Sequence, residues 1–428
     1  MIAANIGRKF LEAYNKKYEM SLSAKDFFIE KYFPLFFDHE KYMQWITNSP
    51  FVQGIKKGVL PTAGERRQKL EALVTKVSNS SADASIAIGY PSLDMTATTS
   101  GQITNLALPL KQDDVYYSWI GSGLGIGIQG GLSILFEKTE VLLDIFDGWE
   151  IYRSYLNKTA RLRGNQINTW NGQWIAHRYN VRTYDSNDKT ANFSPTESIK
   201  DGGIEVPTQA WTAIMIGMSQ TFPDIQLTGY VYNLGQMNTT IGFIPFKLPQ
   251  IKRTTELYKK YFGTNKREEA EHLFGTAFGF TKACQMGSIG INAMEPKGLR
   301  EYIDKGKLPV YTEEDNERKI NFHTYQIWLL AMLNNEQLWE HAQQFAALLN
   351  QYALSSEKGK KDKSNNLKAV LGSVNKKQFM DFLTIVVQDT SSETGYLEMA
   401  KLVNAMPVDN VPYFLTLIRF HFASINKQ

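Results

Sequence analysis

The sequence predicts an α+β fold in which an irregular mixed α/β N-terminal domain precedes a C-terminal antiparallel helical bundle. Three observations support this prediction. Apolar residues recur at helical spacing up to residue 78, that periodicity fades from 79 to about 249, and it returns toward the C-terminal end. At 428 residues the chain exceeds one ordinary domain. We therefore expect an N-terminal helical segment (1–78), a mixed α/β domain (79–318) and a helical bundle (319–428).

The N-terminal segment contains two clear helix signals. From Ser23 to Phe37, aromatic residues such as Phe28 and Tyr32 recur at helical spacing, and Ser23 is a suitable N-cap. Pro34 is expected to kink or end this helix, because proline has no N–H to donate. A second, highly charged helix is expected from 64 to 77.

The middle of the chain predicts short strands separated by turns, over 85–88, 103–108, 126–136, 229–232 and 240–246. A helix is expected from 141 to 156, with a local weakness at Gly148, and an exposed polar loop from 183 to 203. The string from Gly125 to Gly130 matches G-x-G-x-x-G, but strand-like residues follow it where a dinucleotide site needs a helix start. These glycines instead indicate a backbone over which another segment passes closely, or two crossing strands.

The C-terminal part is almost entirely helical in pattern. Aromatic and aliphatic residues follow helical spacing from 322 to 352, resume at 379–386 and 397–403, and end in a helix from 410 to 425. Pro412 is tolerated in the first turn of that last helix. A lysine-rich linker is expected from 355 to 366. Four or five helices joined by short loops predict an antiparallel bundle.

The composition indicates a globular protein, with 43% apolar and 21% charged residues and a net charge of +4. A single cysteine, Cys284, excludes intramolecular disulfides and cysteine-based zinc sites, and its apolar neighbours predict a buried thiol.

No phosphate-binding lysine loop, zinc-protease motif or nucleophile elbow is present, so we expect no cofactor, metal site or catalytic residue. The N-terminus lacks a signal-like apolar run, and the uncharged stretch 115–136 is rich in glycine. A cytoplasmic, soluble protein is expected.

The stretch from Arg161 to Tyr179 is the main candidate for binding. It holds three arginines, five side-chain amides and two tryptophans without an acidic residue. Arginine and amides can bond to phosphates and base edges, and aromatic rings can stack on bases. We expect phosphate contacts from Arg161, Arg163 and Arg178, with Lys56 and Lys57 on a separate basic loop. Base-edge contacts are expected from Asn165, Gln166, Asn168, Asn171 and Gln173, and stacking or wedging from Trp170 or Trp174. The alternative is a polar loop whose amides bond to one another and to the backbone.

The organisation of the chain resembles the large subunit of type I CRISPR effector complexes, the Cascade assembly. The likeness rests on residues 99–104, on the glycine-rich run 119–127, on 164–174 and on the helical bundle from Ile320 onward. Some members carry paired C-x-x-C zinc motifs, which this chain lacks. The resemblance implies a non-enzymatic, double-stranded DNA-binding subunit of a guide-RNA surveillance complex active in antiviral defense.

Such a subunit reads a short motif flanking the target (PAM recognition) and helps open the duplex into an R-loop. Its bundle is similar to the small subunit of the complex and guides the displaced strand. The implied partners are guide RNA, target DNA, the backbone and small subunits, and a helicase-nuclease. The residue roles given above come from side-chain chemistry and not from this resemblance.

Two other classes of function remain open. One is a restriction-type, metal-dependent DNA endonuclease with a degenerate site between 78 and 250. The other is a scaffold or sugar-binding protein, because carbohydrate sites also pair aromatics with amides, as Trp170-Asn-Gly-Gln-Trp174 does.

Overall fold

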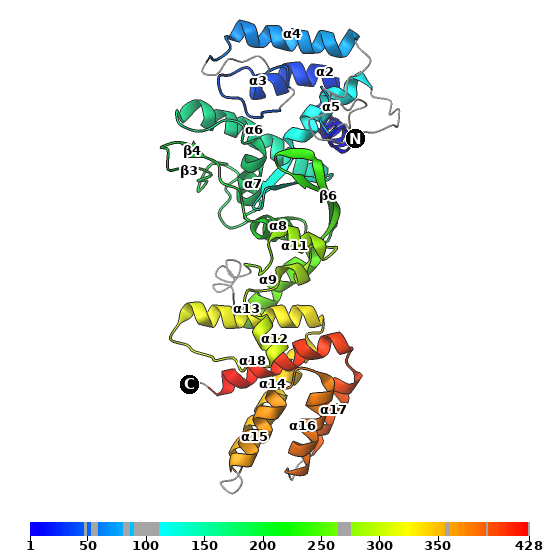
Figure 1. Cartoon of the computed structure of the whole chain (residues 1–428), viewed down its shortest axis with the longest axis vertical. Coiled ribbons are helices and arrows are strands. Elements are labelled where there is room, and N and C mark those ends of the chain that lie inside the picture. Colours follow the sequence, from blue (N-terminus) through cyan, green and yellow to red (C-terminus); the bar gives the residue numbers. More distant parts are fainter. Residues whose placement is uncertain are drawn as a thin grey trace. The chain divides into compact units, whose positions relative to one another are not determined.

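A computed structural model of the chain is mostly helical, with small antiparallel sheets (Figure 1). The α+β class predicted from the sequence is confirmed. The chain divides into two compact units, Met1–Phe246 and Lys247–Gln428, so residues 247–318 belong with the C-terminal helices. The structure describes residues 1–46, 49–52, 59–79, 86–89, 111–263, 275–355, 360–390 and 393–426.

In the first unit, α1 (Ile2–Lys17) lies directly against α5 (Gln112–Gly123). Two glycines allow their backbones to touch. A Cβ atom on Gly7 would lie 2.1 Å from the carbonyl oxygen of Tyr117, and one on Gly121 would lie 1.8 Å from that of Ala3. Any larger side chain at these positions has to push the two helices apart.

The predicted helix from Ser23 to Phe37 forms in three parts: α2 (Ala24–Phe27), a π-helical turn η1 (Phe28–Tyr32) and α3 (Phe33–Phe36). The Ser23 hydroxyl accepts a hydrogen bond from the Asp26 N–H at 3.1 Å, which confirms it as the N-cap. Pro34 does not end the helix. The wider π-turn before it relieves the clash that a proline ring makes with the preceding turn, so the helix continues to Phe36.

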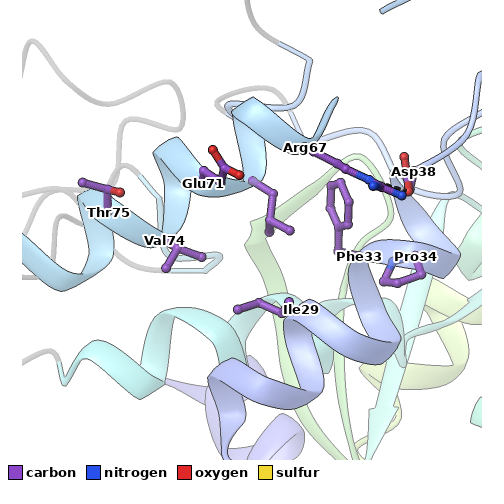
Figure 2. Close-up of a pocket in the computed structure, with 9 residues that line it drawn as sticks. Ile29, Phe33, Pro34, Asp38, Arg67, Glu71, Val74 and Thr75 are labelled. Carbon is purple, nitrogen blue, oxygen red and sulfur yellow. Dashed lines mark ion pairs between the residues drawn. The ribbon is translucent and has the colours of Figure 1, made fainter. Parts of the chain in front are cut away.

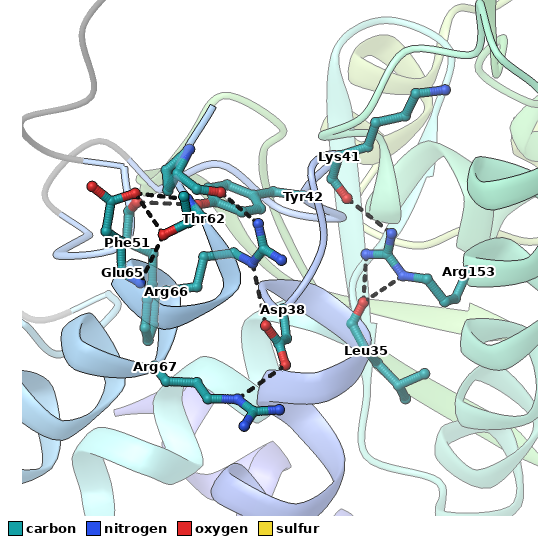
Figure 3. Close-up of polar contacts among 11 residues, drawn as sticks. Leu35, Asp38, Lys41, Tyr42, Phe51, Thr62, Glu65, Arg66, Arg67 and Arg153 are labelled. Atoms are coloured by element: carbon teal, nitrogen blue, oxygen red, sulfur yellow. Dashed lines mark hydrogen bonds and ion pairs between the residues drawn. The ribbon is translucent and has the colours of Figure 1, made fainter. Parts of the chain in front are cut away.

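The long helix α6 (Thr139–Lys158) is held against the segment after α3 by two cations (Figure 3). The buried guanidinium of Arg153 donates to the carbonyl oxygens of Leu35 at 2.7 Å and Lys41 at 2.9 Å. Burial lowers the pKa of Arg153 to about 10. The Lys41 ammonium in turn donates to the carbonyls of Thr159 and Ala160, at 2.7 and 2.8 Å, just beyond the last turn of α6.

Helix α4 (Ala63–Asn79) confirms the predicted charged helix. Thr62 and Glu65 form a reciprocal capping box at its start: the Glu65 carboxylate accepts from the Thr62 N–H, and the Thr62 hydroxyl accepts from the Glu65 N–H (Figure 3). Only Leu73 and Val77 of this helix are buried hydrophobic residues, so α4 packs on the unit through a narrow face.

The four-stranded sheet has the order β1 (Ile126–Ile128), β2 (Leu132–Phe136), β5 (Gln226–Asn233) and β6 (Gln236–Lys247). The predicted strand 126–136 is therefore a hairpin, which turns through Gly130 and Gly131 at φ values of +95° and +73°. The predicted strands 229–232 and 240–246 lie within β5 and β6. Residues 86–88 form a turn instead of the predicted strand, and 103–108 lie outside the described residues.

Helices α7 (Ile167–Arg178) and α8 (Trp211–Thr221) complete the first unit with the short strands β3 (Glu197–Ser198) and β4 (Ile204–Glu205). The polar loop predicted from 183 to 203 is mostly irregular, as expected, and contains β3. Helix α7 was not expected, and it packs against β1 and α6. Helix α6 runs through Gly148 without the predicted weakness.

The second unit contains helices throughout, and α12 to α18 pack together as the predicted bundle. Helix α15 occupies much of the stretch predicted to be a lysine-rich linker, so that prediction was wrong from Lys360 onward. None of the helices in the described part of the chain is long and apolar enough to cross a membrane. The described residues of this unit form the helices α9 (Leu248–Phe262), α11 (Phe280–Gln285), η2 (Ile291–Met294), α12 (Arg300–Lys305), α13 (Asn316–Leu333), α14 (Gln337–Leu354), α15 (Lys360–Leu371), α16 (Lys376–Gln388), α17 (Thr394–Ala405), η3 (Val408–Asn410) and α18 (Val411–Ile425).

Arg419 on the last helix, α18, forms hydrogen bonds to other helices of the bundle. Its buried guanidinium donates to the carbonyls of Leu371 and Ser373, both at 2.9 Å, and to that of Tyr302 at 2.6 Å. These carbonyls lie at the ends of α15 and in α12, so one side chain ties three helices together. Burial lowers the pKa of Arg419 to about 10.

Cys284 on α11 is buried, as the sequence predicted, and burial raises the pKa of its thiol to about 11. Because only the thiolate is nucleophilic, a raised pKa slows alkylation. We expect iodoacetamide at pH 8 to label the native chain roughly a hundredfold more slowly than the urea-unfolded chain. Comparable rates, followed by mass spectrometry, would contradict the buried thiol.

Candidate nucleic-acid interface

The two tryptophans expected to stack on bases are core residues of α7. Trp170 and Trp174 each have 0% of their surface exposed. The indole N–H of Trp170 donates to the Gly148 carbonyl at 2.9 Å, and that of Trp174 donates to the Asp144 carbonyl at 2.7 Å. Trp170 also stacks on Tyr152, with ring centroids 4.7 Å apart. Neither ring offers a face to a nucleobase, so their assignment as stacking residues is corrected.

Several of the expected base-reading amides bond to the protein's own backbone. Asn171 is fully buried and donates to the carbonyls of Gly123 and Gly125 at 2.7 and 2.8 Å. Asn168 donates to the Gly125 carbonyl at 3.0 Å, and Gln173 donates to the Pro207 carbonyl at 2.9 Å. Gln166 accepts from the Val206 N–H at 3.1 Å. Asn171 is therefore excluded as a base reader, and Gln166, Asn168 and Gln173 act here as links between α7 and its neighbours.

Glycines explain why α7 can pack so tightly on β1. A Cβ atom on Gly172 would lie 2.2 Å from the Gly127 carbonyl oxygen, and one on Gly127 would lie 2.9 Å from the Asn168 carbonyl. This confirms the prediction that another segment passes closely over the glycine-rich run. A Cβ on Gly148 would lie 2.5 Å from the Trp174 ring, so this glycine makes room for the indole.

Arg178, at the end of α7, is engaged within the protein. Its guanidinium lies 3.3 Å from the Asp144 carboxylate and 4.4 Å from the centroid of the Tyr184 ring. The Tyr179 hydroxyl donates to the same carboxylate at 2.9 Å. Burial raises the pKa of Asp144 in spite of the opposing effect of Arg178. These contacts stabilise a local network, and they leave Arg178 poorly placed for phosphate.

The expected site residues that remain exposed lie in the loop before α7. Arg161, Arg163 and Asn165 are exposed, and Asn165 adopts a left-handed φ of +62°. Arg163 is paired with Asp201 and, at 3.6 Å, with Glu205. Arg161 has no acidic partner among the described residues, and the same holds for Lys158 at the end of α6. Among the described residues, two cations at or just before this loop therefore lack an acidic partner.

An exposed tryptophan that sequence reasoning did not select lies beside this loop. The Asn165 N–H donates to the Tyr42 carbonyl at 2.7 Å, and the Ile167 N–H donates to that of Met43 at 3.2 Å. Trp45 follows two residues later and has 52% of its surface exposed. The sequence could have indicated this exposure, because Trp45 lies just before a turn and outside any amphipathic helix.

We call Trp45, Lys158, Arg161, Arg163 and Asn165 the α6–α7 surface. Two backbone hydrogen bonds fix the loop part of this surface. The Arg163 N–H donates to the Ile204 carbonyl, and the Ile204 N–H donates to the Arg161 carbonyl. These bonds hold the loop in place, while Arg161, Arg163 and Asn165 remain exposed. Cations with an exposed indole and an amide can together bind phosphate and stack on a base.

Lys56, Lys57 and the stretch 99–104 lie outside the described residues. His177 is buried, and desolvation lowers its pKa. No group of three or more histidine, cysteine or acidic side chains in the described part of the chain is arranged to hold a metal ion.

Comparisons with protein-family models, with curated proteins and with solved structures find no match to this chain.

Proposed function

We propose that the chain is a non-catalytic, double-stranded DNA-binding large subunit of a guide-RNA surveillance complex in the cytoplasm, and that it contacts DNA through the α6–α7 surface. In this proposal it reads a short motif beside the target, aids duplex opening and recruits a helicase-nuclease. The observation that carries the DNA contact is the half-exposed Trp45, which follows a segment hydrogen-bonded to the loop before α7. Arg161 in that loop and Lys158 at the end of α6 are exposed and have no acidic partner among the described residues. The separate C-terminal helical bundle supports the likeness in layout.

The roles of the residues differ from those expected from the sequence. Arg161 and Lys158 hold phosphates, with Arg163 contributing once its pairing with Asp201 is exchanged for a phosphate. Trp45 takes the stacking or wedging role in place of Trp170 and Trp174. Asn165, whose side chain is exposed, is the remaining base-edge reader. Few base contacts are needed, because pairing with the guide recognises the rest of the target.

Replacing Arg161 with glutamine is expected to weaken duplex binding at every sequence. Loss of one phosphate contact should reduce the slope of log affinity against log salt by about 0.9. Fluorescence anisotropy with a labelled duplex over a salt series measures this slope. The matched control is Lys377→Gln, which removes an exposed cation from α16. An unchanged slope in the Arg161 variant, or an equal change in the control, would rule out the phosphate contact.

Replacing Trp45 with alanine is expected to cost roughly tenfold in affinity for a duplex with an opened or mismatched step, because stacking contributes ~1–3 kcal/mol per base. Fully paired DNA should be affected less. Phe243→Ala, which removes another exposed aromatic of the same unit, is the control and should bind normally. If both variants bind opened DNA as well as the unchanged protein does, Trp45 does not stack.

The assembly is tested separately. The tagged chain is purified from its own host, and the RNA that accompanies it is sequenced. We expect guide RNAs that share a repeat-derived end, together with backbone subunits. Recovery of the chain without RNA, or cleavage of plain duplex DNA by the purified chain with magnesium, would contradict the proposal.

A further inference from the structure

The first unit contains a groove that is unrelated to the α6–α7 surface. It lies between α4 and the helical run from η1 to α3 and encloses about 500 Å³ (Figure 2). That volume falls in the range of pockets for small organic ligands, and it is short for a partner helix. Because α4 packs mainly through Leu73 and Val77, the neighbouring residues Leu70 and Val74 are only partly covered by the rest of the described chain.

The floor of the groove is apolar. Figure 2 shows Ile29 facing Val74 across it and Phe33 pointing toward the Arg67 end of α4, and Leu70 and Pro34 are the other apolar residues of the lining. Ile29, Leu70 and Val74 are only partly buried, so apolar surface remains in contact with water. Covering such surface with an apolar ligand is favourable by roughly 25 cal/mol per Å². The π-turn η1 forms part of this wall, and π-turns in helices often accompany binding sites.

One end of the groove carries an excess of positive charge. The Asp38 carboxylate is shared by two guanidiniums, at 3.2 Å from the Arg66 Nε and 3.8 Å from the Arg67 Nε. Arg66 is the closer and more shielded partner, and it also donates to the Pro61 carbonyl. Arg67 is 72% exposed and lines the groove, and its longer contact is that of a weak surface pair. A ligand anion can therefore engage Arg67 while Arg66 keeps Asp38 neutralised.

A negatively charged residue lies farther along the same wall of the groove. Glu71 and Thr75 lie one and two turns beyond Arg67 on α4 and also line the groove (Figure 2). Glu71 has no cationic partner among the described residues. An anionic head next to Glu71 would be repelled, so this arrangement orients a ligand with its head at Arg67 and its body over Val74 and Ile29.

We propose that this groove binds a small amphiphile with an apolar body and a single anionic head, held by Arg67. The apolar floor indicates the apolar body of the ligand, and the weaker contact of Arg67 with Asp38 indicates its anionic head. It does not depend on DNA binding, and the two proposals can fail separately.

The test uses the full-length protein with isotope-labelled methyl groups and decanoate as the probe, below the concentration at which it forms micelles. We expect saturable shifts in the methyl resonances of Ile29, Leu70 and Val74. The methyl groups of Leu73 and Val77, on the buried side of α4, should respond much less. Decanol, which has the same chain length and no charged head, should bind at least roughly tenfold more weakly.

Arg67→Gln should weaken decanoate binding roughly tenfold, because it removes the charge-assisted contact but leaves the apolar floor in place. Lys76→Gln changes an exposed cation on the same helix outside the groove and should leave binding unchanged. The proposal is overturned if decanoate does not saturate, if the shifts fall elsewhere, or if both probes and both variants bind alike.

Discussion

Replacing Trp170 with alanine is expected to lower the free energy of unfolding by about 3–5 kcal/mol, the largest effect of any change considered for this protein. The indole is fully buried, stacks on Tyr152 and donates its N–H to the Gly148 carbonyl. Truncation therefore leaves a cavity and removes the hydrogen bond to the Gly148 carbonyl. Urea unfolding followed by far-UV circular dichroism gives the change.

Trp45→Ala is the matched control for this prediction, because it removes the same side chain from a position that is 52% exposed. Its effect on stability should stay within about 0.5 kcal/mol. The two variants separate the two roles of tryptophan: Trp170 should affect folding, and Trp45 should affect only binding. If Trp170→Ala unfolds at the same urea concentration as the unchanged chain, α7 does not pack as described.

Replacing Gly121 with alanine is expected to destabilise the first unit by about 1–3 kcal/mol or more, although alanine is the better helix former. The added methyl would lie 1.8 Å from the Ala3 carbonyl oxygen, and backbone atoms cannot rotate away as a side chain can. Helices α1 and α5 must therefore separate, and their packed contacts are lost. The unfolding midpoint in urea reports this change.

Gly64→Ala tests the same chemical change where there is room for it. Gly64 lies in the first turn of α4, and the nearest atom to an added Cβ there is the Thr62 hydroxyl oxygen at 4.0 Å. Alanine should be neutral or stabilise the chain by up to about 1 kcal/mol, because it restricts the unfolded chain more than glycine does. Equal effects at Gly64 and Gly121 would show that α1 and α5 are not in close contact.

Much of the architecture is predictable from local patterns. The Ser23 cap, the charged helix α4, the strands within β5 and β6 and the helical bundle all follow from spacing and capping chemistry that neighbouring residues supply. The close approach over Gly127 also follows, since repeated glycines leave space that another segment can fill. The buried Cys284 was predicted from its apolar neighbours.

The candidate site was harder to predict, and the reason lies in helix α7. Its apolar face is interrupted by amides, so the sequence favoured an exposed polar segment. Those amides are satisfied by carbonyls from distant segments: Asn171 by Gly123, 48 residues away, and Gln173 by Pro207, 34 residues away. No local pattern can show partners that only folding brings together.

By itself the sequence determined many of the helices and strands, though not α7 or α15, because capping, periodicity and backbone freedom act between near neighbours. Only the tertiary structure decided which tryptophans form the core and which one faces solvent. Trp174 is enclosed because Gly148 opens space in α6, and Trp170 is enclosed against Tyr152 of the same helix. Trp45, in contrast, has 52% of its surface exposed. Burial depends on contacts between segments far apart in the chain, and the residue type alone does not specify them.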